Sequence, residues 1–90
     1  MTGKLGMNPE EVKQLAEQMD RTAEQIDECM RNVTTKLQGT TWEGTDRQQF
    51  ESTWQSDSVR HLTQIKQLLS ESAMKARRNA QDQEQTSGRV

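Results

Sequence analysis

The most constraining feature of the sequence is a set of apolar residues that recur every seven positions in its first half. Two such rows interleave: Val12, Met19, Ile26 and Val33 form one, and Ala16, Ala23, Met30 and Leu37 form the other. Residues seven apart lie on the same side of an α-helix, so the pattern places both rows on one narrow face. The first half of the chain is therefore predicted to be one long amphipathic helix.

Both ends of this predicted helix carry recognisable signals. Asn8 suits the N-cap position, Pro9 fits the first helical position, and Glu11 follows the cap by three residues. Gly39 comes just after the pattern, at the usual place for a left-handed C-terminal cap. We expect the helix over about residues 8–38. Its solvated face should carry the charged residues between the rows: Glu17, Asp20, Arg21, Glu24, Asp27, Glu28, Arg31 and Lys36.

A second helix is predicted over about residues 45–82, with Thr45 as cap and Gln48 three residues later. Ser58 interrupts its apolar stripe, and the polar residues 83–90 are expected to form a flexible tail. The inner face is predicted to contain Phe50, Trp54, Leu62, Ile65, Leu69, Ala73 or Ser72, Ala76 and Ala80, with Leu68 at its edge.

The short connection 39–44 forces the two helices to run antiparallel. The predicted fold class is all-α, with residues 1–90 forming a single domain shaped as a two-helix hairpin. Leu, Ile, Val and Phe supply only 13 of the 90 residues, so one hairpin would be marginally stable by itself. We therefore expect two hairpins to form a four-helix bundle, with the larger apolar residues of both helices in the hairpin core or the dimer contact.

Composition and charge disfavour several functional classes. The net charge is −2 and no continuous basic face exists, so nucleic acid is not an expected partner. One Cys and one His are too few ligands for a zinc site, and no cofactor is expected. His61 shares a helical surface with Asp57 and Ser58, but a surface ion pair is a better interpretation than a catalytic triad. The first residues lack the apolar run of a signal peptide, which predicts a soluble protein without a cleaved leader.

The centre of the chain carries a more specific motif. Trp42-Glu43-Gly44 lies between the two predicted helices, and Phe50 and Trp54 follow on the first turns of the second. In this setting the chain resembles the WXG-100 family of ESAT-6-like proteins. The resemblance implies an actinobacterial source and a four-helix-bundle dimer, formed with itself or with a related chain of the same type. It also implies passage from the cytoplasm to the outside through a type VII (ESX-like) secretion system, without a cleaved signal peptide and with a membrane-bound P-loop ATPase as partner.

The resemblance carries Trp42 and Gly44 over as the motif residues of the turn. Gly44 can adopt a positive φ that other residues disfavour, and an indole beside it can fold over the helix ends. Trp42 therefore has two possible roles, closing the end of the core or being recognised directly.

The end of the second helix departs from the family pattern. Relatives commonly carry an export signal of Tyr, three residues, then Asp or Glu, whereas this chain contains no Tyr. Either a partner chain supplies the tyrosine or this tail is read differently, and a merely solvated helix end is the alternative. The candidate residues at this place are Arg77, Arg78, Asn79 and Asp82.

Two other functions are weighed against secretion. A membrane-active factor would need a wide apolar face opposite basic residues, whereas these rows are narrow and bordered by mixed charges. An intracellular structural coiled coil would have no use for the Trp-Glu-Gly turn. The protein is not expected to be an enzyme, because side chains on one helical surface, such as Asp57, Ser58 and His61, have no pocket and no oxyanion donors.

Overall fold

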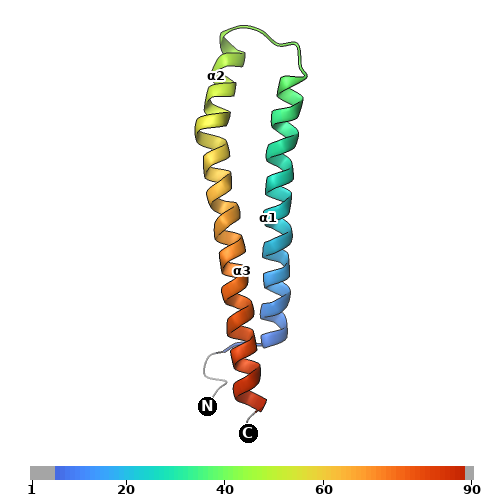
Figure 1. Ribbon diagram of the computed structural model, residues 1–90, viewed down its shortest axis with the longest axis vertical. Coiled ribbons are helices and arrows are strands. Elements are labelled where there is room, and N and C mark those ends of the chain that lie inside the picture. Colours follow the sequence, from blue (N-terminus) through green and yellow to red (C-terminus); the bar gives the residue numbers. More distant parts are fainter. Residues whose placement is uncertain (1–5, 89–90) are drawn as a thin grey trace.

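The computed structural model describes residues 6–88, which form an antiparallel helical hairpin (Figure 1). One arm is α1, Pro9–Gln38. The other consists of α2 (Thr45–Thr53), the π-helical segment η2 (Trp54–Ser58) and α3 (Val59–Gly88). The molecule is a thin rod of 68 × 18 × 14 Å. The predicted all-α hairpin is confirmed.

The start of α1 follows the signals in the sequence. The Asn8 side chain accepts a hydrogen bond of 3.1 Å from the Glu11 backbone N–H, and Pro9 occupies the first turn. The acidic residues of this turn also face the positive end of the helix dipole. At the other end the Gly39 N–H donates to the Thr35 carbonyl at 3.1 Å. The predicted left-handed cap is wrong, because φ of Gly39 is −89°. Capping therefore sets the length of α1.

The start of the second arm differs from the prediction, because Thr45 is its first helical residue rather than its cap. Gly44 holds the cap position with φ +118° and ψ −176°, and no side-chain hydrogen bond caps this helix. The Gln48 N–H is satisfied by the Gly44 carbonyl at 3.2 Å. Space around Gly44 is open, so its backbone angles are what require glycine.

The interruption of the apolar stripe at Ser58 corresponds to the π-helical segment, which breaks the single predicted helix. A π turn takes in one more residue than an α turn. The eight positions from Trp54 to Leu62 therefore advance the helix surface about as far as seven α-helical positions would. The wide turn thus keeps Trp54 and the apolar row of α3 directed toward the same side of the arm.

The end of α3 also differs from the prediction, because the helix continues to Gly88 rather than stopping near residue 82. Gln83 is only 7% exposed, and Glu84 forms an ion pair with Lys13 on α1. These contacts hold residues that composition alone assigned to a flexible tail. Residues 89–90 lie outside the part that the structure describes.

The buried core changes in size along the rod. On the described chain it consists of Ala16, Ala23, Met30, Leu37, Ala73, Ala80 and Gln83. The alanines lie toward the end that holds the termini, where small side chains let the helices approach closely. Toward the loop the core residues are larger, and no Cα of α2 or η2 comes within 8 Å of a Cα of α1. The hairpin is therefore narrow at one end and splayed at the other.

Candidate functional site

The described residues offer surfaces rather than an enclosed reaction site. They include no group of three or more His, Cys, Asp or Glu side chains suited to a metal ion. His61 is exposed, and no ion pair within residues 6–88 joins it to Asp57, so the expected surface pair is absent. Cys29 is exposed and unpaired by disulfide. The candidate sites are thus the loop end and the two long faces of the rod.

At the loop end, three aromatic rings line up along the second arm. The Trp42 and Phe50 centroids are 6.4 Å apart with a tilt of 37°, and Phe50 stacks on Trp54 at 5.9 Å. The Trp54 indole N–H donates to the Thr34 hydroxyl on α1 at 3.0 Å, which ties the splayed arms together. Trp42 and Phe50 nevertheless stay 39% and 40% exposed. Trp42 thus packs on one side and remains open to solvent on the other.

Arg47 organises the loop in a way that the sequence did not reveal. Its Nη1 donates to the carbonyl of Trp42 at 3.0 Å and to that of Thr40 at 3.4 Å. Arginine is an unfavourable residue in the first turn of a helix, where the dipole is positive. That position was the available signal that Arg47 serves the loop rather than the helix.

One long face of the hairpin is bridged by polar contacts that recur every seven residues along α1. Lys13 pairs with Glu84 at 2.8 Å, and Asp20 pairs with Arg77 at 2.6 Å. The same row continues through Asp27 and ends at Thr34, the partner of Trp54. Since these contacts follow one side of the seam, they fix how the two helices are aligned, and we call this side the ion-pair face.

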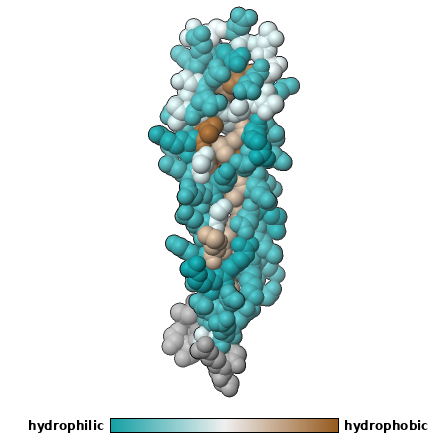
Figure 2. Space-filling model, viewed as in Figure 1, coloured by the Kyte–Doolittle hydropathy of each residue, from teal (hydrophilic) through white to brown (hydrophobic). Residues whose placement is uncertain are grey.

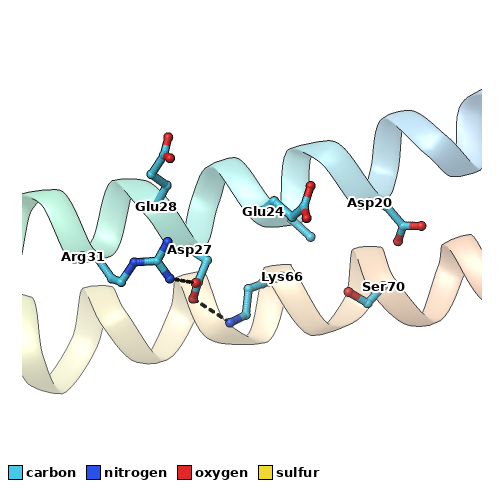
Figure 3. Close-up of a pocket in the computed structure, with 8 residues that line it drawn as sticks. Asp20, Glu24, Asp27, Glu28, Arg31, Lys66 and Ser70 are labelled. Carbon is cyan, nitrogen blue, oxygen red and sulfur yellow. Dashed lines mark hydrogen bonds and ion pairs between the residues drawn. The ribbon is translucent and has the colours of Figure 1, made fainter.

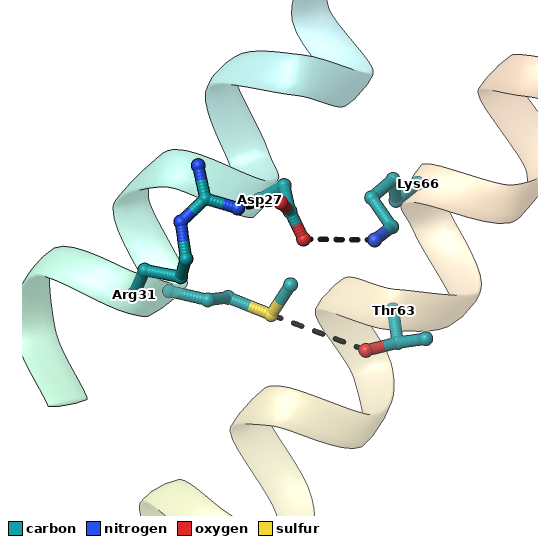
Figure 4. A network of polar contacts seen from close by, with 5 residues as sticks. Asp27, Arg31, Thr63 and Lys66 are labelled. Atoms are coloured by element: carbon teal, nitrogen blue, oxygen red, sulfur yellow. Dashed lines mark hydrogen bonds and ion pairs between the residues drawn. The ribbon is translucent and has the colours of Figure 1, made fainter.

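Asp27 is the centre of this face. Its Oδ1 accepts from Lys66 at 2.8 Å across the seam, and its other oxygen contacts Arg31 one turn along α1 (Figure 4). Beside it the Thr63 hydroxyl lies 4.0 Å from the Met30 sulfur. Asp20 and Asp27, which were predicted on the solvated face, lie beside the seam with basic residues opposite both, while the Asp20 side chain stays 43% exposed.

The charges on this face shift two titrations. The hydrogen bond from Lys66, together with the positive charges of Lys66 and Arg31, lowers the pKa of Asp27. The hydrogen bond to Glu84 raises the pKa of Lys13. Both shifts favour the charged forms that pair across the seam.

A shallow groove on the ion-pair face is lined mainly by charged side chains. Its walls are Asp20, Ala23, Glu24, Asp27, Glu28, Arg31, Lys66 and Ser70. Glu28 points away from α3, whereas Lys66 and Arg31 are directed to Asp27 (Figure 3). The basic groups of the groove are thus already engaged with Asp27.

The opposite long face is apolar. The predicted core residues of this face lie beside the seam, half-buried or exposed: Val12, Met19, Ile26 and Val33 on α1, and Leu62, Ile65 and Leu69 on α3. Val33 and Ile65 are 37% and 45% exposed. Heptad positions place these rows on the side away from the ion pairs. The hairpin thus leaves Val33 and Ile65 exposed and the other residues of these rows only half-buried, so one chain does not enclose them.

The border of this apolar face is largely uncharged. The neighbouring heptad positions carry Leu15, Thr22, Cys29 and Lys36 on α1, and Ser72 and Asn79 on α3. By contrast, Figure 2 shows a face of the rod where hydrophilic side chains cover both helices and leave only a narrow apolar band along the seam. We use the name open apolar face for the side that carries Val33 and Ile65.

The candidate tail residues lie on α3, far from the turn. Arg77 pairs with Asp20, whereas Arg78, Asn79 and Asp82 are exposed. The loop and the end of α3 are at opposite ends of the rod (Figure 1). One chain therefore does not bring its Trp-Glu-Gly turn and its tail together.

The comparisons with known proteins agree with the motif at the turn. The chain has no significant match among curated proteins or solved structures, and none of the helices within residues 6–88 has the length and apolarity needed to cross a membrane. The family model WXG100, described as proteins of 100 residues with WXG, matches residues 4–87, and Trp42 and Gly44 supply the two named positions. The chain therefore belongs to the WXG100 family.

Proposed function

We propose that this protein is a secreted substrate or co-substrate of a type VII (ESX-like) secretion system, acting through protein contacts rather than catalysis. The observation that carries the proposal is the Trp-Glu-Gly turn, which joins two long antiparallel helices in a chain of the WXG100 family. Export from the cytoplasm would depend on the membrane-bound P-loop ATPase of that system.

The proposed working form is a dimer that covers the open apolar face. Val33, Ile65 and their neighbours remain accessible in one hairpin, and a second hairpin on this face would remove them from water. The few charges along its border impose little repulsion between identical chains, so a second copy is an acceptable partner. A related WXG-type chain is the alternative partner.

The unequal width of the hairpin favours one orientation of that dimer. A splayed, aromatic end fits best beside a narrow, alanine-lined end, because interiors pack to an even density. Two hairpins would then lie head to tail, and the Trp42 turn of one would approach the α3 end of the other. A receptor could in this way read a turn and a tail from two different chains.

The secretion assay compares culture supernatants of cells with an active and an inactivated motor ATPase. We expect the protein outside the cell only when the motor is active, with a cytoplasmic protein as the control for lysis. Equal amounts in both supernatants would contradict the proposal.

The dimer is tested separately by light scattering of the purified chain. A mass of twice 10.4 kDa supports a homodimer. A stable helical monomer would contradict self-pairing, and mixing with a related chain would then test the heterodimer.

To test the role of the tail, a truncation must leave the packing of α3 against α1 intact. Ala80 is fully buried and Glu84 pairs with Lys13, so a deletion that includes these residues would also damage the hairpin. Removing residues 85–90 avoids this problem. We expect the shortened chain to stay helical, and normal export of it would show that the signal lies in the remaining residues or on a partner.

A further inference from the structure

The loop between the two arms has few backbone hydrogen bonds of its own. At its start the Thr40 N–H reaches the Leu37 carbonyl at 3.2 Å, and at its end the Gln48 N–H reaches the Gly44 carbonyl at 3.2 Å. Between these points the carbonyls of Thr40 and Trp42 accept hydrogen bonds from one side chain, that of Arg47. The Arg47 side chain on α2 therefore holds the backbone in the middle of the loop.

The Arg47 side chain is committed to this task. It is only 21% exposed, although arginine seldom gives up its hydration without partners. Its Nε forms an ion pair with the Glu51 carboxylate at 3.8 Å, a separation longer than a hydrogen bond, and this buried Nε has no hydrogen-bond partner. The hydrogen bonds that hold the guanidinium in place are thus those to the loop carbonyls.

These contacts determine where the Trp42 indole lies. Arg47 holds the Trp42 backbone through its carbonyl, and Phe50 supports the ring at 6.4 Å. The ring nevertheless remains 39% exposed. A large aromatic side chain is thereby kept in one place while part of it faces solvent.

We propose that Arg47 is a positioning residue that holds Trp42 ready for recognition during dimerisation or export. The inference rests on the proposed function, because it assumes that the loop end is recognised. An aromatic group that is already ordered loses less conformational entropy on binding than a mobile one. By ordering Trp42, Arg47 thus raises the affinity of the contact between Trp42 and its partner, even if Arg47 itself does not touch that partner.

The test places Trp42 as the sole fluorophore by using the Trp54→Phe chain as the reference. Within it, Arg47→Ala removes the hold on the loop, and Glu51→Ala is the matched control that leaves the carbonyl contacts intact. Acrylamide quenching reports the mobility and exposure of Trp42, circular dichroism reports the fold, and the supernatant assay reports export. We expect Arg47→Ala to raise the quenching constant about 2-fold and lower export about 10-fold, with little change in helix content. Glu51→Ala should match the reference.

The conservative variant separates positioning from a general loss of stability. Arg47→Lys keeps the charge but offers a compact donor on a flexible stem in place of a rigid fork. We expect Arg47→Lys to have the melting temperature of the Trp54→Phe reference. Its quenching constant and its exported amount should lie between those of the reference and those of Arg47→Ala. If export followed the fraction of folded protein in all variants, Arg47 would be merely structural and the inference would be overturned.

Two other results would also overturn it. Unchanged quenching in Arg47→Ala would show that Arg47 does not fix Trp42. Raised quenching with normal export and dimerisation would show that the position of Trp42 is irrelevant to recognition, while the proposed function would stand. If the unsubstituted chain were not exported, the proposed function would fail, whereas quenching and light scattering would still decide whether Arg47 positions Trp42 for dimerisation.

Discussion

Enlarging a seam alanine should separate the two helices at the narrow end of the rod. Ala73 and Ala80 on α3 are fully buried, as is Ala16 on α1, and Ala23 is only 5% exposed. Replacing Ala73 by leucine adds an isopropyl group where the opposing helix leaves no room. The helices would have to move apart, and the ion pair between Asp20 and Arg77 near this site would be stretched.

The expected destabilisation follows from overpacking. Inserting methylene groups into a packed core costs typically about 1–3 kcal/mol. In a domain of this size that corresponds to a decrease in melting temperature of roughly 10 °C. The change in intrinsic helix propensity from alanine to leucine is much smaller than this, so overpacking should dominate.

The assay is thermal unfolding followed by circular dichroism, at one fixed protein concentration because pairing would make the melting temperature concentration-dependent. Ala76→Leu is the matched control, since Ala76 is half-buried on the same helix three residues away and lies beside the open apolar face. Its larger side chain should leave the hairpin intact. If Ala73→Leu and Ala76→Leu melted alike, alanine would not determine how closely the helices approach.

Three further substitutions test the open apolar face, the ion-pair face and the turn. Ile26→Asp should abolish the concentration dependence of melting, because a buried charge without a partner costs several kcal/mol, and a persistent dependence would contradict the dimer face. Asp27→Asn should make the stability of the fold less sensitive to acid. The hydrogen bond from Lys66 lowers the Asp27 pKa below its ordinary 3.8. The carboxylate therefore stabilises the fold above pH 3.8, and this contribution is lost as the pH falls through the lowered pKa. An unchanged acid titration of melting would contradict this. Gly44→Ala should cost about 1–3 kcal/mol in chemical denaturation, because φ is +118°, whereas Gly39→Ala at φ −89° should cost less, and equal losses would contradict the conformational argument.

The first arm could be predicted from sequence because its signals are local. The heptad rows, the Asn8 cap and the Gly39 stop all act within a few residues of where they stand. The antiparallel hairpin followed from the short loop, and the family followed from Trp42 and Gly44 in that loop.

The second arm was harder to predict because tertiary contacts determine it. The interruption at Ser58 indicated a defect in the helix but not a π turn. Composition assigned residues 83–88 to a tail, whereas Gln83 and Glu84 pack and pair against α1. The role of Arg47 could not be predicted, because its hydrogen-bond partners are backbone carbonyls, which no side-chain pattern reveals.

The two long faces show how far a charge pattern can mislead. The charges of Asp20 and Asp27 predict a solvated face, yet their spacing of seven places them in one row with Lys13 and Thr34 beside the seam. Pairing across the seam occupies this face with exposed and half-exposed ion pairs, which align helices more than they stabilise them. The ion pairs of residues 6–88 do not extend to the opposite face, which carries Val33 and Ile65 in the open. Because burial of apolar surface favours binding, a partner should bind only the open apolar face of the rod. Pairing would therefore give a closed dimer rather than an open-ended assembly.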